Sequence, residues 1–208
     1  MALYNNERMF IFFHLYKCGG NSLRRVVNDQ LKGSKELLGV HVLPKDVQRH
    51  YITRQKLDRF NEMFKFTIVR NPFEFILSNY HYVRKFPNHF MYDEAIKMPF
   101  SEFPDFYMEW REKHIEENIH GKNKVCTMYE FLHDDKGNML MDYIGKLETI
   151  NEDFKYICEK IGIDYRTMPY INVNKKNDKP YRQVYDDATR EKVEKYFAKD
   201  LKLLKYEF

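Results

Sequence analysis

Residues 9–22 read M-F-I-F-F-H-L-Y-K-C-G-G-N-S. Residues 9–14 are almost all apolar, so both faces of an extended chain would be apolar here, which is typical of a central strand in a parallel sheet. The pair Gly19-Gly20 then indicates a turn, and Ser22 opens a stretch with apolar residues at helical spacing that ends near Gly33. The sequence therefore predicts a strand, a glycine-rich loop and a helix in direct succession.

A second unit of this kind follows at residues 64–83. The run F-K-F-T-I-V at 64–69 is another buried-strand candidate, and Asn71 and Pro72 then start a helix, because Asn is a favoured N-cap and Pro is favoured at the first helical position. The other predicted elements are a strand at 37–43, a helix at 53–60 with Thr53 as N-cap, strands at 129–133 and 139–147 around a turn at Gly137, a helix at 151–161 that stops at Gly162, and a helix from Asp186 or Asp187 to about Leu204.

Strands and helices that alternate with short connections predict an α/β fold with a mainly parallel sheet. The chain has 208 residues, and this length favours one domain over residues 1–208 rather than two separate cores. Residues 86–124 are aromatic, charged and mostly helical in pattern, and they are interpreted as an insertion or cap. Residues 172–183 form a basic loop.

The composition is that of a soluble globular protein. Lys+Arg 35 against Asp+Glu 31 gives a net charge of +4, which suits an anionic ligand at one site and falls short of what a nucleic-acid wrapper carries. The 3 cysteines are widely spaced and give neither a disulfide framework nor a zinc pattern. No apolar run is long enough to span a bilayer, and residues 1–8 lack the apolar core of a signal peptide. We expect a cytoplasmic protein that binds no nucleic acid and has no membrane span; no motif indicates an oligomeric state.

The loop at residues 17–22, K-C-G-G-N-S, has the features of an anion-binding site. Paired glycines let the backbone approach a ligand closely, and the N–H groups and dipole of the following helix favour a phosphate or sulfate there. Lys17 adds a mobile positive charge and Ser22 a hydroxyl. In a Walker A loop the lysine follows the last glycine, whereas Lys17 precedes both glycines, so ATP-dependent chemistry is disfavoured. The plain alternative is a tight turn with a surface lysine.

Arg70 follows the predicted strand at 64–69. Ligands of open α/β sheets gather at the carboxyl ends of the strands, so Arg70 and the loop at 17–22 should face one crevice. The guanidinium fork suits a phosphate monoester, and Ser78, two turns into the next helix, could flank the same group. A surface arginine that bonds a helix-start carbonyl is the alternative for Arg70 taken alone.

These two stretches resemble motifs of the sulfotransferases that use 3′-phosphoadenosine 5′-phosphosulfate (PAPS). H-L-Y-K-C-G-G-N-S-L at residues 14–23 is similar to their 5′-phosphosulfate loop, roughly H-x-P-K-T-G-G-T-S-L, although Cys18 and Asn21 replace threonines and Tyr16 replaces proline. F-T-I-V-R-N-P-F-E at 66–74 with S-N-Y at 78–80 is similar to their 3′-phosphate motif, in which an arginine is frequent at the position of Phe75. Residues 139–150 and 185–208 also fit, and the nearest likeness is to the carbohydrate (uronyl 2-O-type) branch.

The resemblance implies a P-loop-like three-layer fold and a role for each motif residue. Lys17 would contact the 5′-phosphate and the sulfuryl oxygens, and Arg70 with Ser78 would hold the 3′-phosphate. The loop at 172–183 would fold over the nucleotide. The implied cofactor-binding residues are Lys17, Cys18, Gly19, Gly20, Asn21, Ser22, Arg70, Ser78, Lys179, Tyr181 and Arg182. For Lys175 and Lys176 a solvated loop is the favoured interpretation.

Catalysis would need a positive group for the leaving phosphate, which Lys17 could supply, and a base for the acceptor hydroxyl. His41 is the candidate base, because it should lie near the sheet edge, titrates near neutral pH and matches the base position of the uronyl 2-O branch. A strand histidine bonded to a carbonyl is the alternative, and His14 is the next candidate. No metal-site spacing is present, and sulfuryl transfer from PAPS in this family needs no metal.

The resulting hypothesis is a PAPS-dependent sulfotransferase that leaves 3′,5′-phosphoadenosine and acts on an acceptor hydroxyl, favoured to be on an oligo- or polysaccharide. The alternatives are a non-catalytic module that binds nucleotide or anionic glycan and, less favoured, an ATP-dependent phosphotransferase. Several aromatic residues could line an acceptor cleft, although core packing is favoured for most of them. They are Tyr82, Phe86, Phe90, Tyr92, Phe106 and Trp110.

Overall fold

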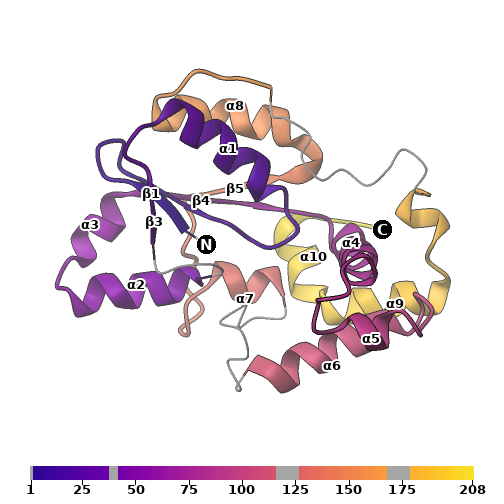
Figure 1. Cartoon of the computed structure of the whole chain (residues 1–208). Coiled ribbons are helices and arrows are strands. Elements are labelled where there is room, and N and C mark those ends of the chain that lie inside the picture. The colour runs from indigo at the N-terminus through magenta and orange to yellow at the C-terminus, as the bar shows by residue number, and fades with distance from the viewer. Residues whose placement is uncertain (1, 38–41, 116–126, 168–178) are drawn as a thin grey trace.

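The computed structural model describes residues 2–37, 42–115, 127–167 and 179–208, and it shows a five-stranded sheet with helices on both faces (Figure 1). The strand order is β3-β1-β2-β4-β5. β2, β4 and β5 run parallel, whereas β1 pairs antiparallel with β2 and β3 at one edge. The predicted α/β class is confirmed. The strands are β1 (Ala2–Asn5), β2 (Phe10–Phe13), β3 (Lys35–Leu37), β4 (Phe64–Val69) and β5 (Tyr143–Lys146).

The two faces of the sheet bury separate apolar clusters, because side chains alternate along a strand. Phe10 and Phe12 of β2 point to the face covered by α1 (Gly20–Gln30) and α8 (Ile150–Ile161), and the ring of Phe12 lies 5.2 Å from that of Phe66 in β4. Ile11 and Phe13 are buried on the opposite face. A strand buried on both faces explains why residues 9–14 are apolar without alternation.

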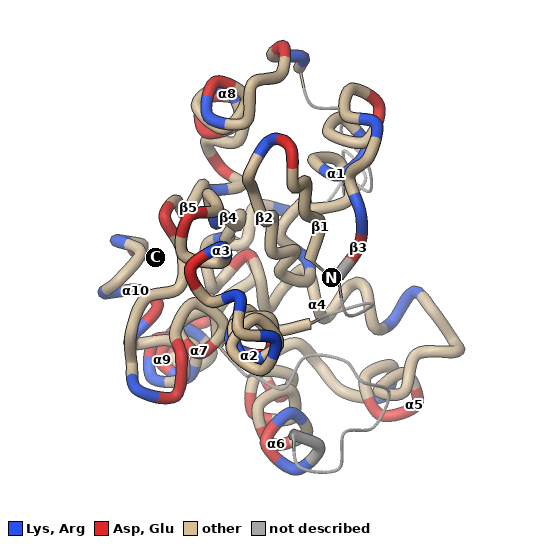
Figure 2. The backbone as a smooth tube through the Cα atoms, turned by 90° about the vertical axis from the view of Figure 1, so that its left-hand side faces the viewer, with Lys and Arg blue, Asp and Glu red and all other residues tan. Residues whose placement is uncertain are grey.

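The other helices belong to the opposite layer and to its extension beyond the sheet. Figure 2 shows α1 and α8 on one side of the strands and α2, α7, α9 and α6 on the other. The helices besides α1 and α8 are α2 (Pro44–Thr53), α3 (Leu57–Glu62), α4 (Pro72–Lys85), α5 (Tyr92–Ala95), α6 (Phe103–Ile115), α7 (Met128–Leu132), α9 (Asp187–Tyr196) and α10 (Ala198–Leu204), with short 3₁₀ turns η2 (Leu147–Thr149) and η3 (Tyr181–Gln183).

Several predicted element boundaries are confirmed. β4 covers the predicted residues, and Asn71 caps α4 by accepting a hydrogen bond from the Phe73 N–H at 3.0 Å. α8 ends at Gly162, which has a φ of 68°. α9 is capped by Asp186, whose carboxylate accepts a hydrogen bond from Thr189 N–H at 2.7 Å. α5 and α6 confirm helices within the region predicted as an insertion; residues 116–124 lie outside the described ranges.

Two predicted elements are wrong, and a third is described only at its two ends. Of the strand predicted at 37–43, Leu37 belongs to β3, residues 38–41 lie outside the described ranges, and residues 42 and 43 form no strand before Pro44 starts α2. Thr53 ends α2 rather than starting a helix, and its hydroxyl donates a hydrogen bond back to the Arg49 carbonyl at 2.9 Å. Residues 129–132 belong to α7, although the turn predicted at Gly137 is present and a His133–Met139 bridge closes it.

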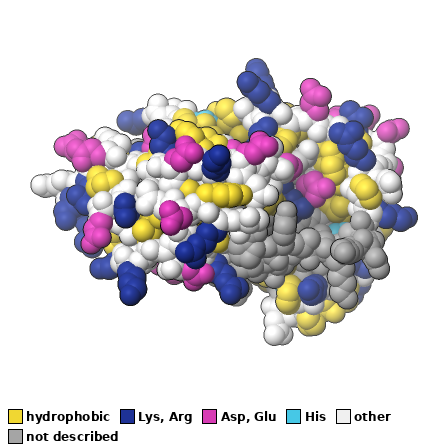
Figure 3. Space-filling model, turned by 90° about the horizontal axis from the view of Figure 1, so that it is seen from above, with side chains coloured by type: hydrophobic (Ala, Val, Ile, Leu, Met, Phe, Trp, Pro, Cys, Tyr) yellow, Lys and Arg dark blue, Asp and Glu magenta, His cyan; other side chains and the backbone are white. Residues whose placement is uncertain are grey.

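No helix in the described ranges is both long and apolar enough to cross a lipid bilayer. In the same part of the chain, no cluster of three or more His, Cys, Asp or Glu side chains could hold a metal ion. The face seen from the α1–α8 side carries Lys and Arg side chains mixed with Asp and Glu (Figure 3). This mixture agrees with the small net charge of +4.

Candidate functional site

The carboxyl ends of the three parallel strands meet at one edge of the sheet. The loop after β2 contacts the end of β5, because a Cβ atom on Gly19 would come within 2.6 Å of Leu147 Cδ1. The turn after β4 is tied to the same place, since the Asn71 N–H donates to Glu148 Oε1 at 2.7 Å. The two motifs singled out in the sequence therefore flank the residues that follow β5.

The loop between β2 and α1 takes two residues in the left-handed region. Lys17 has a φ of 61° and Gly19 a φ of 75°, and this backbone turns the chain into α1 at Gly20. No side chain larger than hydrogen fits at Gly20, because a Cβ atom there would overlap the His14 ring. Among the described residues no side chain caps α1, and its first turn contains no acidic residue. This helix start is therefore suited to an anion.

Lys17 is half-buried beneath aromatic rings. Its Nζ lies 4.0 Å from the centroid of the Tyr82 ring and 5.9 Å from that of Tyr16. Burial, followed by the charge of Arg70, lowers the pKa of Lys17 to about 8. Arg70 also acts on the pKa of the Cys18 thiol. Both effects require short distances, so the loop at 17–22 and the turn after β4 lie close together.

Cys18 and Ser22 turn their side chains inward. The Cys18 side chain is fully buried in the core, and burial raises the pKa of its thiol, so the thiol is neutral at pH 7. Ser22 is also buried, whereas Asn21 is exposed. Cys18 can therefore bind an anion only through its backbone N–H group.

Arg70 lies just before α4, and Ser78 lies in the middle of that helix. An Nη atom of Arg70 donates to Glu74 Oε2 at 2.6 Å, and this pair keeps the guanidinium beside the helix. Ser78 lies one turn beyond Glu74 and is buried. The Arg70 side chain is 17% exposed, so only a small part of it reaches solvent.

The described part of the loop at 172–183 reaches the same helix. The Tyr181 ring stacks on Phe73 with centroids 6.1 Å apart, and the Arg182 guanidinium lies 5.8 Å from the Phe208 ring. Lys179 is exposed, and no described contact links it to these residues. Residues 172–178, and with them Lys175 and Lys176, lie outside the described ranges.

The two candidate bases have different outcomes. His41 lies outside the described residues, so its prediction stays untested. The His14 ring lies against Gly20 and is stacked near Phe12, with ring centroids 6.1 Å apart. In this position the His14 ring packs against the loop and helps to set its shape.

Sequence reasoning missed the residues that lock this edge of the sheet. Glu148 accepts from Asn71 N–H through Oε1 and from the Tyr206 hydroxyl through Oε2 at 2.7 Å. Lys146 Nζ lies 4.3 Å from the centroid of the Tyr206 ring, and Asn71 Nδ2 donates to the Glu207 carbonyl at 3.3 Å. The place of Glu148 just after a strand was the only available signal, because Tyr206 reaches it from 58 residues away.

Taken together, the edge offers two neighbouring cations, Lys17 and Arg70, and an uncapped helix start. Such a site can bind a ligand with more than one negative group.

The profile of the Sulfotransferase family matches residues 2–207, which is nearly the whole chain. No match to a curated protein or to a solved structure was found.

Proposed function

Because the chain belongs to the Sulfotransferase family, whose members are PAPS-dependent enzymes, we propose that it transfers a sulfuryl group from PAPS to a hydroxyl group of a carbohydrate. The observation that carries the proposal is the pair of neighbouring cations. Burial, followed by the charge of Arg70, lowers the pKa of Lys17, and Arg70 itself is paired with Glu74 at 2.6 Å; an anion with several negative groups would favour the charged form of Lys17 and add a partner for Arg70. The carbohydrate acceptor rests on the likeness of residues 14–23 and 66–80 to the uronyl 2-O-type branch.

The residues at the sheet edge fit a doubly phosphorylated adenosine. Lys17 and the backbone N–H groups of residues 18–22 would hold the 5′-phosphosulfate, supported by the uncapped start of α1. Arg70, just before α4, and Ser78, within that helix, would hold the 3′-phosphate. Tyr181 packs on Phe73 of α4 and Arg182 lies near the Phe208 ring, where they would cover the nucleotide, and Lys179 would join them.

The chain's own groups would act by positioning and charge. The donor supplies the sulfuryl group when bound. The acceptor oxygen forms the new bond to sulfur, the bond from sulfur to the 5′-phosphate oxygen breaks, and the acceptor proton passes to a base. Lys17 would stabilise the charge that grows on the leaving phosphate oxygen. We propose His41 as the base on sequence grounds alone.

The direct test incubates the protein with sulfur-labelled PAPS and a panel of glycans, phenols and peptides. We expect label on a glycan, and we expect Lys17→Ala to abolish the transfer and to weaken binding of 3′,5′-phosphoadenosine. His41→Ala should lower turnover by roughly 100-fold while nucleotide affinity is retained. An unchanged rate in Lys17→Ala would remove Lys17 from the mechanism.

Two other results would replace the proposal. Binding of 3′,5′-phosphoadenosine without transfer to any acceptor would identify a non-catalytic binding module. Thermal stabilisation by ATP with Mg²⁺, and none by 3′,5′-phosphoadenosine, would identify a phosphotransferase. The second result is disfavoured, because no G-K-S/T order is present in the loop at 17–22.

A further inference from the structure

A cavity of about 200 Å³ lies where β1, α2 and α3 meet. Its basic lining residues are His50, Arg54, Lys56 and Arg59, and Tyr4, Tyr51 and Asn6 complete the lining. We call it the α2–α3 cavity. It is smaller than the pockets of roughly 300–1,000 Å³ that hold drug-sized ligands, so its size suits a small molecule.

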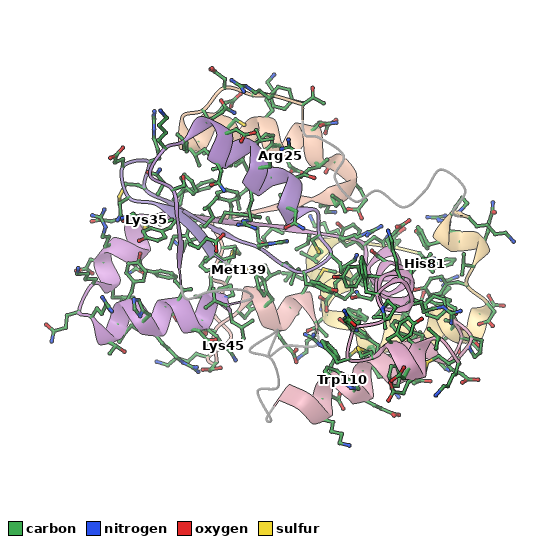
Figure 4. The ribbon with its side chains drawn as sticks, viewed as in Figure 1. Arg25, Lys35, Lys45, His81, Trp110 and Met139 are labelled. Atoms are coloured by element: carbon green, nitrogen blue, oxygen red, sulfur yellow. The ribbon has the colours of Figure 1, made fainter. Side chains whose placement is uncertain are left out.

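The α2–α3 cavity lies at the end of the sheet opposite to the site described above. The turn between β1 and β2, which carries Asn6, and the end of α3, which precedes β4, both lie where the parallel strands begin. Lys17 and Arg70 follow the other ends of β2 and β4, and the 6 residues of β4 span roughly 20 Å. In Figure 4, α2 and α3 lie on the left, whereas α4, marked by His81, lies on the right. A ligand in this cavity would therefore lie apart from Lys17 and Arg70.

The cations of the α2–α3 cavity differ from the other cations of α2 in their partners. Lys45, which is labelled in Figure 4, and Arg49 both contact the carboxylate of Asp135. Within the described ranges, the Lys and Arg residues of the cavity form no ion pair, and neither Asp58 nor Glu62 of α3 lines it. Three positive charges without a carboxylate partner make the cavity complementary to an anion.

The backbone between α2 and α3 brings two of these cations to the cavity. Gln55 has a φ of 56°, in the left-handed region that residues other than glycine seldom adopt. Its N–H donates to the Ile52 carbonyl, and the next N–H, of Lys56, donates to the Tyr51 carbonyl, each at 2.9 Å. Arg54 and Lys56, on either side of Gln55, both line the cavity as a result. Residues held in such conformations cluster at ligand-binding sites.

Arg59 is positioned by the turn after β1. One of its Nη atoms donates to Asn6 Oδ1 at 3.2 Å and to the Asn6 carbonyl at 3.3 Å. In the described part of the chain, its other Nη atom donates no hydrogen bond. Burial and Tyr4 raise the pKa of the Tyr51 hydroxyl, whereas the charge of Arg59 lowers it, so the guanidinium lies close to this tyrosine. Arg59 is thus held at the cavity and retains donors for a ligand.

The lining of the α2–α3 cavity suits an organic phosphate better than an inorganic anion. Arginine presents a fork of N–H donors that matches phosphate oxygens, and lysine adds a compact charge. The Tyr51 ring is buried and the Tyr4 ring is half-buried, so their apolar faces could pack against the carbon atoms of a ligand. Inorganic phosphate would leave these rings without a contact, and a neutral molecule would leave the cations without a counter-charge.

We propose that the α2–α3 cavity is a second ligand site, which binds a small organic phosphate monoester. The phosphate would lie among Arg54, Lys56 and Arg59, and the organic part would lie against Tyr4 and Tyr51. The inference goes beyond the proposed function and does not rest on it, because no residue of this cavity takes part in the proposed transfer.

An NMR titration of the full chain that follows its backbone N–H signals tests the site, because it reports which residues a ligand affects. The probe is ribose 5-phosphate, compared with inorganic phosphate and with ribose. We expect saturable shifts of the Gln55 and Lys56 signals with ribose 5-phosphate, at least tenfold weaker binding of inorganic phosphate, and no saturable shift with ribose.

Three results of this titration would overturn the inference. Equal affinity for inorganic phosphate would overturn the organic class of ligand, and saturable shifts with ribose would overturn the recognition of phosphate. Shifts confined to residues 17–22 and 70–78 would show that ribose 5-phosphate binds only at the other end of the sheet.

Two variants separate the cavity from the overall charge of α2. Arg54→Gln removes a cation of the cavity, and Arg49→Gln is the matched control, because Arg49 is also exposed but lies outside the cavity and contacts Asp135. Arg54→Gln should weaken binding of ribose 5-phosphate at least fivefold, and Arg49→Gln should change it less than twofold. The spectra also show whether each variant is folded.

Equal affinities of the two variants would overturn the inference. If both bound ribose 5-phosphate more weakly by the same factor, net charge rather than the cavity would attract the ligand. If both bound it as wild type does, Arg54 would serve only to stabilise the carboxyl end of α2.

Discussion

The surroundings of Lys17 disfavour the charged form of its amine. Burial and the neighbouring Arg70 lower its pKa to about 8, and the Tyr82 ring 4.0 Å away offsets part of that effect, because the face of an aromatic ring attracts a cation. A bound anion would restore the charge fully. Binding of a phosphate or sulfate should therefore raise the charged fraction of Lys17 more than that of a lysine in open solvent.

This pKa predicts how nucleotide binding depends on pH. The charged form of Lys17 is complete well below pH 8 and is lost as the pH rises through about 8, so affinity for 3′,5′-phosphoadenosine should fall by up to about tenfold between pH 7 and pH 9. Lys17→Arg keeps its charge throughout this range and should show a flat profile. Calorimetric titration at several pH values makes the comparison, and a flat wild-type profile would contradict it.

At the scale of single elements, the start of α1 depends on the absence of a side chain at one position. A Cβ atom on Gly20 would overlap the His14 ring, and the backbone at Gly20 does not have a positive φ, so the obstacle is steric rather than conformational. Gly20→Ala should displace His14 and the loop and lower nucleotide affinity at least tenfold. Asn21→Ala, at the exposed next position, should change it less than threefold. Nucleotide titration of both variants measures the difference, and equal affinities would contradict this account of the loop.

The contact between α10 and α7 should make stability depend on pH. Asp200 of α10 accepts a hydrogen bond from Tyr129 N–H at 2.9 Å, but burial raises the pKa of its carboxyl to about 6. The folded state therefore binds a proton more tightly than the unfolded state, and the contribution of Asp200 to the free energy of unfolding falls as the pH rises from about 4 to about 6.

Asp200→Asn removes this titration and keeps an acceptor oxygen for the helix start. The variant should gain stability relative to wild type between pH 4 and pH 6, by about 2 kcal/mol at the upper end, and the gain should then stay constant. Urea denaturation at each pH measures the gain. A difference that does not change between pH 4 and pH 7 would show that Asp200 titrates normally.

Elements with strong local signals could be predicted from the sequence, and elements with competing signals could not. The sequence predicts β4 and the start of α4 correctly, because the mostly apolar run F-K-F-T-I-V is followed by Asn71 and Pro72, two strong signals of a helix start. The predicted hairpin around Gly137 requires a strand at 129–133, whereas the capping box formed by Thr127 and Glu130 starts a helix there. Pro44 likewise starts α2, and Thr53, which can cap a helix start, instead bonds to the end of that helix.

At the scale of the whole molecule, the last residues of the chain complete the edge of the sheet. Tyr206 bonds to Glu148, and the Glu207 carbonyl accepts from Asn71. The Phe208 ring lies 4.9 Å from Phe73, with Tyr181 and Tyr185 around it. No local pattern could predict these contacts, because each joins residues more than 20 positions apart. The sequence predicts that the two motifs meet at one edge of the sheet, and of the residues that hold them there only Glu148, just after a strand, has a local signal.

Removing the Phe208 ring should therefore destabilise the whole protein. The ring is partly buried between three aromatic neighbours, and Arg190 lies 4.7 Å from its centroid, so Phe208→Ala should cost about 2 kcal/mol of unfolding free energy. Leu203→Ala is the control, since Leu203 is 37% exposed on α10 and should cost about 0.5 kcal/mol or less. Chemical denaturation monitors both variants, and equal losses would contradict the role of Phe208.

The tie between Glu148 and Tyr206 also has a consequence for limited proteolysis. Cleavage that removes residues 206–208 would take away partners of Glu148, Asn71 and Phe73 at once. The turn after β4 would then keep its hydrogen bond to Glu148 but lose the contacts on its other side. Trimming three residues would therefore loosen a turn that lies 136 positions away along the chain.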